Sequence, residues 1–270
     1  MAAGLVIATV TYNSLADLRE FFPELARVAG EVGIGIVAVD NASSDESGDF
    51  LDSWTDRVEL HVERNERNRG YAAAVNQAFA AAPGSDVLLL NPDVALNEGR
   101  QVQELRDGLA RLPKAAVVAP RLLEPDGSVQ ASARPFPTVP AMAGHSSWLG
   151  RLGFGRRAAA RYLEIPAADE PSRVDWALGA AMLIRRESFD QVGGWDESFF
   201  LYLEDTDFCL RCRRAGWESW YLPSVSLRHL HPRSSDPARG GIHRSPARRH
   251  HIRSAIRFFR RYPELAFRSL

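Results

Sequence analysis

Short runs of apolar, mostly β-branched residues alternate along the first half of the chain with longer segments whose apolar residues recur at helical spacing. The short runs predict strands at residues 5–11, 34–39, 58–63, 86–90 and 115–119. Helices are predicted between them at residues 15–28, 70–82 and 102–112. Strands that alternate with helices in this way predict an α/β fold with a mostly parallel, Rossmann-like central sheet flanked by helices.

The alternation weakens after Pro120. Residues 124–127 form a predicted turn, three prolines mark an extended connection, and residues 144–168 are interpreted as a mobile excursion. Order returns with strands at residues 180–184 and 219–222, which flank the stretch 193–214 around which we consider the chain organised. We therefore predict one domain over residues 1–235, with halves 1–119 and 120–235, and an extension over residues 236–270.

The extension begins with a loop, predicted at residues 234–246 from its Gly, Pro and Ser content, and ends in a helix from about Ala247. Ile252, Ala255, Ile256 and Phe259 share one face of this helix, and arginines surround them. Two interpretations stay open: the apolar stripe packs against the domain, or the helix lies on an anionic membrane surface.

Composition excludes several classes of protein. A hydrophobic content of 45% and a charged content of 25% are typical of globular proteins, and a net charge of −1 argues against a nucleic-acid binder. The two cysteines, Cys209 and Cys212, lie in a predicted helix without a second pair, so we expect buried packing rather than a zinc site. We find no signal peptide and no apolar run of the ~20 residues a spanning helix needs, and expect a cytoplasmic protein, soluble or peripheral to the membrane.

Polar side chains follow the predicted strands where each strand ends. In parallel sheets ligands bind outside the carboxyl ends of the strands, so one site is expected to collect these residues. Their carboxylate and amide oxygens suit Mg²⁺ or Mn²⁺. No dinucleotide-binding glycine motif, P-loop or Ser-containing nucleophile elbow is present. The strand-end residues are Thr11, Tyr12, Asn13, Asp40, Asn41, Gly70, Asn91 and Asp93.

A cluster of acids, Glu204, Asp205 and Asp207, directly follows the apolar run 199–203. A carboxylate beside a buried apolar wall is a candidate general base, because burial raises its pKa. The alternative is that these acids cap the helix that follows.

Six motifs in order resemble the inverting family 2 glycosyltransferases with a GT-A fold, and within them the rhamnosyltransferase-like branch. The resemblance covers about residues 6–235. The motifs are VTYN, VDNASSD, NRGYAAAVNQA, LLLNPDV, GAAMLIRRESF and GGWDESFFLYLEDTDFCLR.

The resemblance implies roles for individual residues. Asp205 is the expected general base, and Asp93 and His229 are the expected ligands of a divalent cation, Mg²⁺ or Mn²⁺. The remaining nucleotide-sugar residues are Thr11, Tyr12, Asn13, Asp40, Asn41, Asp45, Asn68, Gly70, Asn76 and Asn91. The acceptor-binding residues are Trp176, Gly179, Trp195, Asp196 and Glu204.

Two positions depart from the family pattern. Asn91 replaces the first acid of the metal-binding D-x-D element, which removes one charge, although N-P-D is common in this branch. Pro232 stands where a glycine is more usual, which would stiffen the hinge after His229.

The resemblance also implies partners. The donor is expected to be a dTDP-linked sugar, L-rhamnose by preference, or a UDP-sugar, and the acceptor a glycan, a lipid-linked sugar or a natural product. No nucleic acid is expected, while a homodimer and membrane contact through the last helix stay open. The rival functions are a catalytically silent nucleotide-sugar-binding module and a nucleotidyltransferase.

Overall fold

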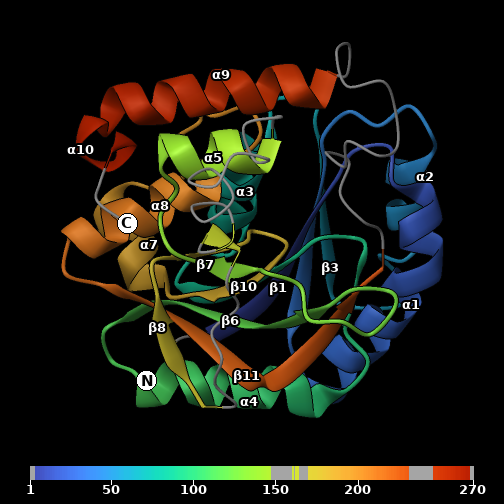
Figure 1. Ribbon diagram of the computed structural model, residues 1–270. Coiled ribbons are helices and arrows are strands. Elements are labelled where there is room, and N and C mark those ends of the chain that lie inside the picture. Colours follow the sequence, from blue (N-terminus) through green and yellow to red (C-terminus); the bar gives the residue numbers. More distant parts are fainter. Residues whose placement is uncertain (1–3, 147–159, 161, 164–169, 231–245, 268–270) are drawn as a thin grey trace.

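The protein has a central sheet with helices on both faces (Figure 1). The computed structural model describes residues 4–146, 160, 162–163, 170–230 and 246–267. Nine strands make this sheet, in the order β3-β2-β1-β4-β10-β6-β11-β5, with β8 paired to β11. The predicted α/β class with a mostly parallel sheet is confirmed. The predicted excursion at residues 144–168 lies largely, and the predicted loop at residues 234–246 almost entirely, outside the described residues.

The N-terminal half of the sheet is parallel throughout and consists of β1 (Gly4–Thr11), β2 (Gly35–Asp40), β3 (Leu60–Arg64) and β4 (Ser85–Leu90). Apolar side chains alternate across β1, so that Leu5 and Ile7 face one core and Ala8 and Val10 the other. The register pairs Thr11 with Asp40, which brings two polar strand ends side by side.

The other half of the sheet joins segments that are distant in the sequence. Strand β10 (Ala181–Ile184) runs antiparallel between β4 and β6 (Ala115–Leu123), and β11 (Glu218–His229) is parallel to β6. The short β5 (Val94–Ala95) pairs antiparallel with the end of β11, with His229 opposite Val94. The smaller strands are β8 (Ser172–Val174), β7 (Ala133–Arg134) and β9 (Trp176–Ala177), and β7 pairs with β9.

Helices cover both faces of the sheet (Figure 1). One core contains residues of α1 (Leu15–Val32) and α4 (Gly99–Arg111), and the other contains residues of α3 (Tyr71–Ala81), α7 (Arg186–Val192), α8 (Glu204–Arg214) and α9 (Pro246–Arg261). Three shorter helices are α2 (Ser47–Asp52), α5 (Val139–Ser146) and α10 (Pro263–Ala266). None of the helices in the described ranges combines the length and apolarity needed to cross a bilayer.

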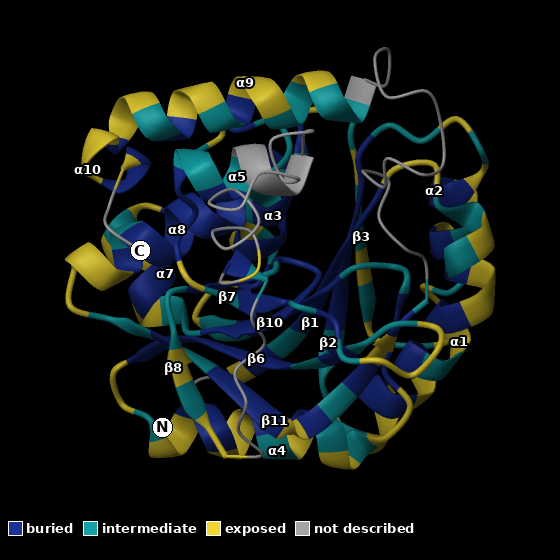
Figure 2. Ribbon diagram, viewed as in Figure 1, coloured by how far each residue is buried: buried dark blue, intermediate teal, exposed yellow. Residues whose placement is uncertain are grey.

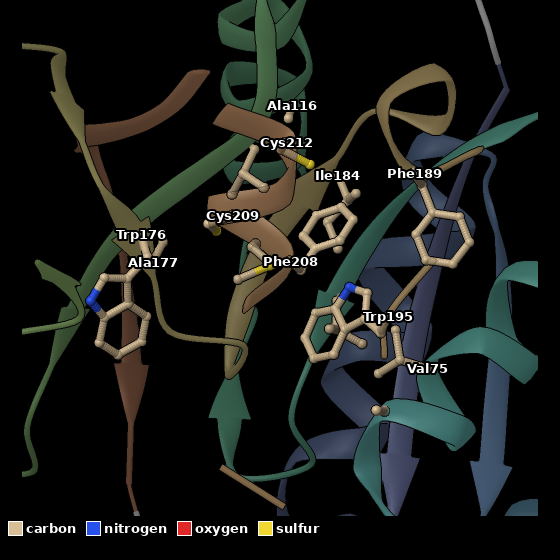
Figure 3. Packing of buried hydrophobic residues seen from close by; sticks show 14 of the residues in the cluster. Val75, Ala116, Trp176, Ala177, Ile184, Phe189, Trp195, Phe208, Cys209 and Cys212 are labelled. Carbon is tan, nitrogen blue, oxygen red and sulfur yellow. The ribbon is translucent and has the colours of Figure 1, made fainter. Parts of the chain in front are cut away.

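Helix α8 packs its apolar residues into an aromatic core (Figure 3), where Phe208 stacks with Trp195 at 5.8 Å between ring centroids. Cys209 and Cys212 are free and buried in the same cluster, as expected for packing residues. Burial raises the pKa of the Cys209 thiol to about 12 and raises that of Cys212 as well, so neither is a thiolate near neutral pH.

The C-terminal helix α9 does pack on the domain, but with a different face from the one expected. Ser254 and Phe258 are buried and Ala255 and Phe259 are partly buried, whereas Ile252 and Ile256 are 48% and 54% exposed. Of the two interpretations left open, packing against the domain therefore holds for Ala255 and Phe259 but not for the two isoleucines. The reason is that the packing line runs through Ser254, Phe258 and the buried Tyr262, which the apolar pattern alone did not single out.

Gly70 precedes α3 with a φ of 88°, and a Cβ there would lie 2.7 Å from the Phe200 carbonyl oxygen. We expect Gly70→Ala to lower the free energy of unfolding by about 2–3 kcal/mol, because strain and a backbone clash add together. Gly84, with a φ of 75° and nothing within 4 Å of its Cβ position, is the matched control. Urea unfolding of both variants measures the difference, and equal losses would contradict the close contact with Phe200.

Candidate functional site

Two loops at the carboxyl ends of β1 and β2 are joined by side-chain hydrogen bonds. Asn13 Oδ1 accepts from the Ser44 backbone N–H at 2.8 Å, and Asp45 Oδ2 accepts from the Leu15 N–H at 3.0 Å at the start of α1. Burial opposes ionisation of Asp45, but hydrogen bonds from Ser47 and Leu15 give a net lowering of its pKa. Asp45 therefore shapes this loop as an ionised acceptor.

Asn41 connects the end of β2 to the loop before α3. Its Nδ2 donates to Asn68 Oδ1 at 3.0 Å and to the Gly70 carbonyl at 3.2 Å, and its Oδ1 accepts from the Arg69 N–H at 2.9 Å. Asp40 is buried beside it, and its Oδ1 accepts from the Ser43 N–H. Asn41 is thus occupied by the protein, and it sets the path of the loop that carries Gly70.

The structure brings Asp93 and His229 together although they lie 136 positions apart in the sequence. His229 Nε2 lies 3.2 Å from Asp93 Oδ2, and His229 Nδ1 lies 2.9 Å from Oε1 of the buried Gln130. The antiparallel pairing of β5 with β11 accounts for this contact, and it continues in the Leu230 N–H donating to the Asp93 carbonyl at 3.0 Å.

These groups fit a divalent cation. When Gln130 Oε1 accepts from Nδ1–H, the lone pair of His229 Nε2 faces a carboxylate oxygen, an arrangement that a cation relieves. Asp93 Oδ1 is buried and has no hydrogen-bond partner among the described residues. No group of three or more acidic, His or Cys side chains that could hold a metal ion is found in the described ranges.

Asp205 lies in the first turn of α8, where it is 7% exposed. Its Oδ2 accepts from the Gly179 N–H at 3.0 Å, and its Oδ1 accepts from the N–H and hydroxyl of Thr206 at 2.6 and 3.1 Å. Burial raises the pKa of this carboxyl, while these hydrogen bonds and the charge of Arg134 oppose the rise. Leu203 at the N-cap has no side-chain cap, and Asp205 accepts from the N–H of Thr206 in the first turn, so this contact agrees with capping as well as with a base role.

Glu204 is the least satisfied acid of the cluster. Its side chain is buried, and Oε2 has no hydrogen-bond partner among the described residues. Burial first, and then the charge of Asp205, raise the pKa of Glu204 well above its ordinary value. The protonated form is therefore stabilised in the folded protein.

Asp207 anchors the other side of the same turn. It is fully buried, and it accepts from Arg211 Nε at 2.7 Å and from the Tyr262 hydroxyl at 2.6 Å. Arg261 Nη1 lies 3.6 Å from Asp207 Oδ1. Asp207 thus joins α8 to the C-terminal helices and does not face the strand-end residues.

Tyr71 links the two groups of acids. Its hydroxyl lies 2.8 Å from Asn91 Oδ1 and 2.9 Å from the carbonyl oxygen of Gly179. The backbone N–H of the same glycine donates to Asp205. Burial raises the pKa of the Tyr71 phenol, and the charges of Glu204, Asp205 and Asp93 raise it further. Tyr71 thus contacts Asn91, two residues before the predicted metal ligand Asp93, and Gly179, which binds the predicted base Asp205.

Other expected site residues have structural partners instead. Asn76 binds the Trp195 backbone through both Oδ1 and Nδ2, at 2.8 and 2.9 Å, and Asp196 pairs with Arg261. Asn76 thus braces α3 against Trp195 and Asp196 contacts α9, and the binding roles expected of both residues stay predictions. Burial raises the pKa of Asp196, yet hydrogen bonds from Ser198 and the pairing with Arg261 lower it overall.

The aromatic residues expected at the site differ in exposure. Tyr12 is 50% exposed and Thr11 is buried next to it. Trp176 is buried and donates to the Pro135 carbonyl at 2.9 Å, while the buried Trp195 has no hydrogen-bond partner for its indole N–H in the described structure.

Three residues near the acids were missed in the sequence. Gln130 follows a turn and carries no motif, whereas Tyr71 directly follows Gly70 in a motif that had been recognised. Arg134 lies over the rings of Tyr162 and Trp176, at 5.3 and 5.6 Å from their centroids. Only the position of Tyr71 beside Gly70 offered a signal in the sequence.

Comparison with known families gives two matches. Glycosyl transferase family 2 matches residues 6–193, and glycosyl transferase family group 2 matches residues 136–262. The chain is 32% identical over 251 residues to the N-acetylglucosaminyl-diphospho-decaprenol L-rhamnosyltransferase of Mycobacterium tuberculosis, covering 88% of this chain and 80% of that protein. It is 28% identical over 237 residues to the low-salt glycan biosynthesis hexosyltransferase Agl10 of Haloferax volcanii, covering 86% and 69%.

Solved structures share the fold. GalNAc-T7 with UDP, GalNAc and Mn²⁺ superimposes with a TM-score of 0.65 at 16% identity, over 99% of this chain and 51% of that chain. The mannosyltransferase PcManGT from Pyrobaculum calidifontis, in complex with GDP-Man and Mn²⁺, gives 0.61 at 18% identity, over 95% and 65%. The present chain therefore spans about half to two thirds of these solved chains.

Glu204→Gln is expected to stabilise the protein at neutral pH. Because the pKa of Glu204 is raised on folding, its contribution to stability is fully present below the ordinary glutamate pKa and is lost as pH rises through the folded value. The variant cannot ionise, so we expect it to match the native chain near pH 4 and to exceed it by about 1–3 kcal/mol at pH 8. Urea unfolding across this range measures the effect. The exposed Glu66 supplies the control Glu66→Gln, and parallel pH curves for Glu204→Gln and the native chain would contradict the assignment.

Proposed function

The chain belongs to glycosyl transferase family 2 and is a glycosyltransferase, and from that premise we propose that it moves a sugar from a nucleoside diphosphate donor to an acceptor hydroxyl with inversion, with Asp205 as the general base. The observation that carries the proposal is the chain of contacts through the partly buried Tyr71, whose hydroxyl binds Asn91, two residues before Asp93, and the carbonyl of Gly179, the residue whose N–H donates to Asp205. A base and a phosphate-binding position must lie in one site for a single displacement to occur.

The protein's own groups support the proton transfer. Asp205 Oδ2 is held by the Gly179 N–H and Oδ1 by Thr206, which orient the carboxylate. Oδ2 accepts only the Gly179 hydrogen bond in the described structure and retains acceptor capacity, so it can take the proton of an acceptor hydroxyl. The acceptor oxygen then bonds to the anomeric carbon while the bond to the donor diphosphate breaks with its electron pair. Raising the pKa of Asp205 by burial makes it a stronger base than an exposed aspartate.

A divalent cation, Mg²⁺ or Mn²⁺, is proposed at Asp93 and His229. Their lone pairs converge, and Gln130 holds the His229 ring through Nδ1. A cation bound there would stabilise the negative charge of the departing diphosphate. Similar solved proteins, GalNAc-T7 and PcManGT, carry Mn²⁺ together with a nucleotide or nucleotide sugar, which supports the assignment.

For the substrates we propose a dTDP-rhamnose donor and a polyprenyl-diphosphate-linked sugar as acceptor. The support is the relative from Mycobacterium tuberculosis, whose name states both rhamnosyl transfer and a diphospho-decaprenol-linked substrate. A 56-residue segment is also 43% identical to the rhamnosyltransferase WbbL of Escherichia coli. UDP-sugars are the alternative donors, as UDP accompanies GalNAc-T7.

Asp205→Asn is expected to lower kcat by about 10²–10⁴-fold, because a positioned base is lost. Donor affinity should stay within about twofold, because Asp205 acts on the acceptor proton. Sugar transfer and calorimetric donor titration measure the two effects, with Asp126→Asn in the exposed turn as the control. Unchanged turnover would remove Asp205 from the mechanism, and donor binding without turnover in the native chain would favour a silent binding module.

Thymidine diphosphate is expected to bind more tightly with Mn²⁺ than with a chelator. Asp93→Asn and His229→Gln should remove at least tenfold of this gain, since each takes away a ligand. Calorimetry with thymidine, uridine and guanosine diphosphates tests the base preference in the same experiment, with Asp126→Asn again as control. Equal affinities with Mn²⁺ and chelator would overturn the metal assignment, and tighter uridine diphosphate binding would overturn the donor.

A further inference from the structure

Helix α9 presents two different faces. Its inner face packs on the domain through Ser254 and Phe258, and it lies along one side of the molecule with its outer face exposed (Figure 2). The outer face carries the exposed Ile252 and Ile256 together with the exposed Arg249, Arg253 and Arg260.

These five residues form one strip, which we call the outer strip. At 3.6 residues per turn, they fall within an arc of about 100°, opposite the buried Ser254 and Phe258. The half-exposed side chains of Ile252 and Ile256 therefore lie between the guanidinium groups of the three arginines on one face of the helix. The strip follows a helix of 16 residues, about 24 Å long.

The charge of the outer strip is available to a partner. Helix α9 contains six arginines and no acidic residue. Arg257 donates to the Ser198 carbonyl and Arg261 pairs with Asp196, so these two serve the domain. Within the described ranges, no ion pair joins Arg249, Arg253 or Arg260 to a carboxylate.

We propose that the outer strip is a binding surface for an anionic lipid bilayer, on which α9 lies parallel to the membrane plane. Arginines attract lipid phosphates, and isoleucines between them gain by entering the acyl boundary. A nucleic acid would use the arginines but offers no apolar layer for Ile252 and Ile256. Charge and apolar exposure together therefore select a lipid surface.

The inner face gives this contact a consequence for the active site. Ser254 Oγ donates to the Leu201 carbonyl at 2.8 Å, and His250 stacks on Phe200 at 4.6 Å. The contacted residues, Phe200 and Leu201, lie three to five positions before Glu204 and Asp205. A bilayer beneath α9 would thus lie one helix away from the base, which suits an acceptor held in the membrane. The binding itself does not depend on the proposed sugar chemistry.

Vesicle co-sedimentation of the full chain, without nucleotide, tests the surface. We expect binding to phosphatidylglycerol–phosphatidylcholine vesicles that is weakened by salt, and little binding to phosphatidylcholine alone. Replacing Arg249, Arg253 and Arg260 by Gln should weaken binding about 100-fold, at about fivefold for each charge. Ile252→Ser with Ile256→Ser should weaken it at least tenfold.

The control carries Arg106→Gln and Arg111→Gln on α4, whose exposed arginines lie on the opposite side of the sheet (Figure 1). It should bind vesicles as the native chain does. Thermal unfolding of all variants should match, because the changed side chains are exposed. Failure to bind anionic vesicles, equal binding by the outer-strip variants, or a loss of self-association in gel filtration without a loss of vesicle binding would each overturn the proposal. Turnover with a water-soluble acceptor reports separately on the sugar chemistry.

Discussion

The burial of three carboxylates in the first turn of α8 is the constraint on which the rest of the site depends. A buried carboxylate is costly unless hydrogen bonds or charges compensate it. Asp207 is compensated by Arg211 and Tyr262, and Asp205 by Gly179 and Thr206. Glu204 has the least compensation, and burial raises its pKa well above the ordinary value. The three acids of this one helical turn therefore differ in environment: Asp207 anchors the C-terminal helices, Asp205 is held by hydrogen bonds beside Gly179, and Glu204 is stabilised in its protonated form.

The same turn is entered through an unusual backbone. Tyr202 and Leu203 both have positive φ, at 71° and 65°, which costs free energy for residues with a Cβ. Neighbouring elements hold this segment from two sides: the Tyr71 N–H donates to the Phe200 carbonyl at 2.8 Å, and Ser254 binds the Leu201 carbonyl. Helices α3 and α9 therefore fix the direction in which α8 begins, and with it the position of Asp205.

Much of this arrangement could be predicted from local patterns. Polar residues after β-branched runs indicated the strand ends, and parallel pairing then required Thr11 and Asp40 to meet, as their register shows. Strand β11 was predicted to end near Leu222 but continues to His229, because a register irregularity accommodates Pro223 where proline normally ends a strand. The contact between Asp93 and His229 depends on that continuation, so spacing alone could not reveal it.

The residues that escaped prediction act through contacts between distant segments. Gln130 orients His229 from 99 positions away, and Tyr262 binds Asp207 from 55 positions away. Neither shows a periodicity, because each is one polar group placed by the tertiary fold. In α9 the helical periodicity placed the apolar residues on one face but did not predict which of them the domain would bury. The covered line through Phe258 and Tyr262 combines apolar packing in the core with the hydrogen bond from the Tyr262 hydroxyl to the buried Asp207, and Ile252 and Ile256 lie on the other face. A polar contact with a distant buried acid thus contributes to the choice of the covered face, and the apolar pattern of the helix alone does not contain that contact.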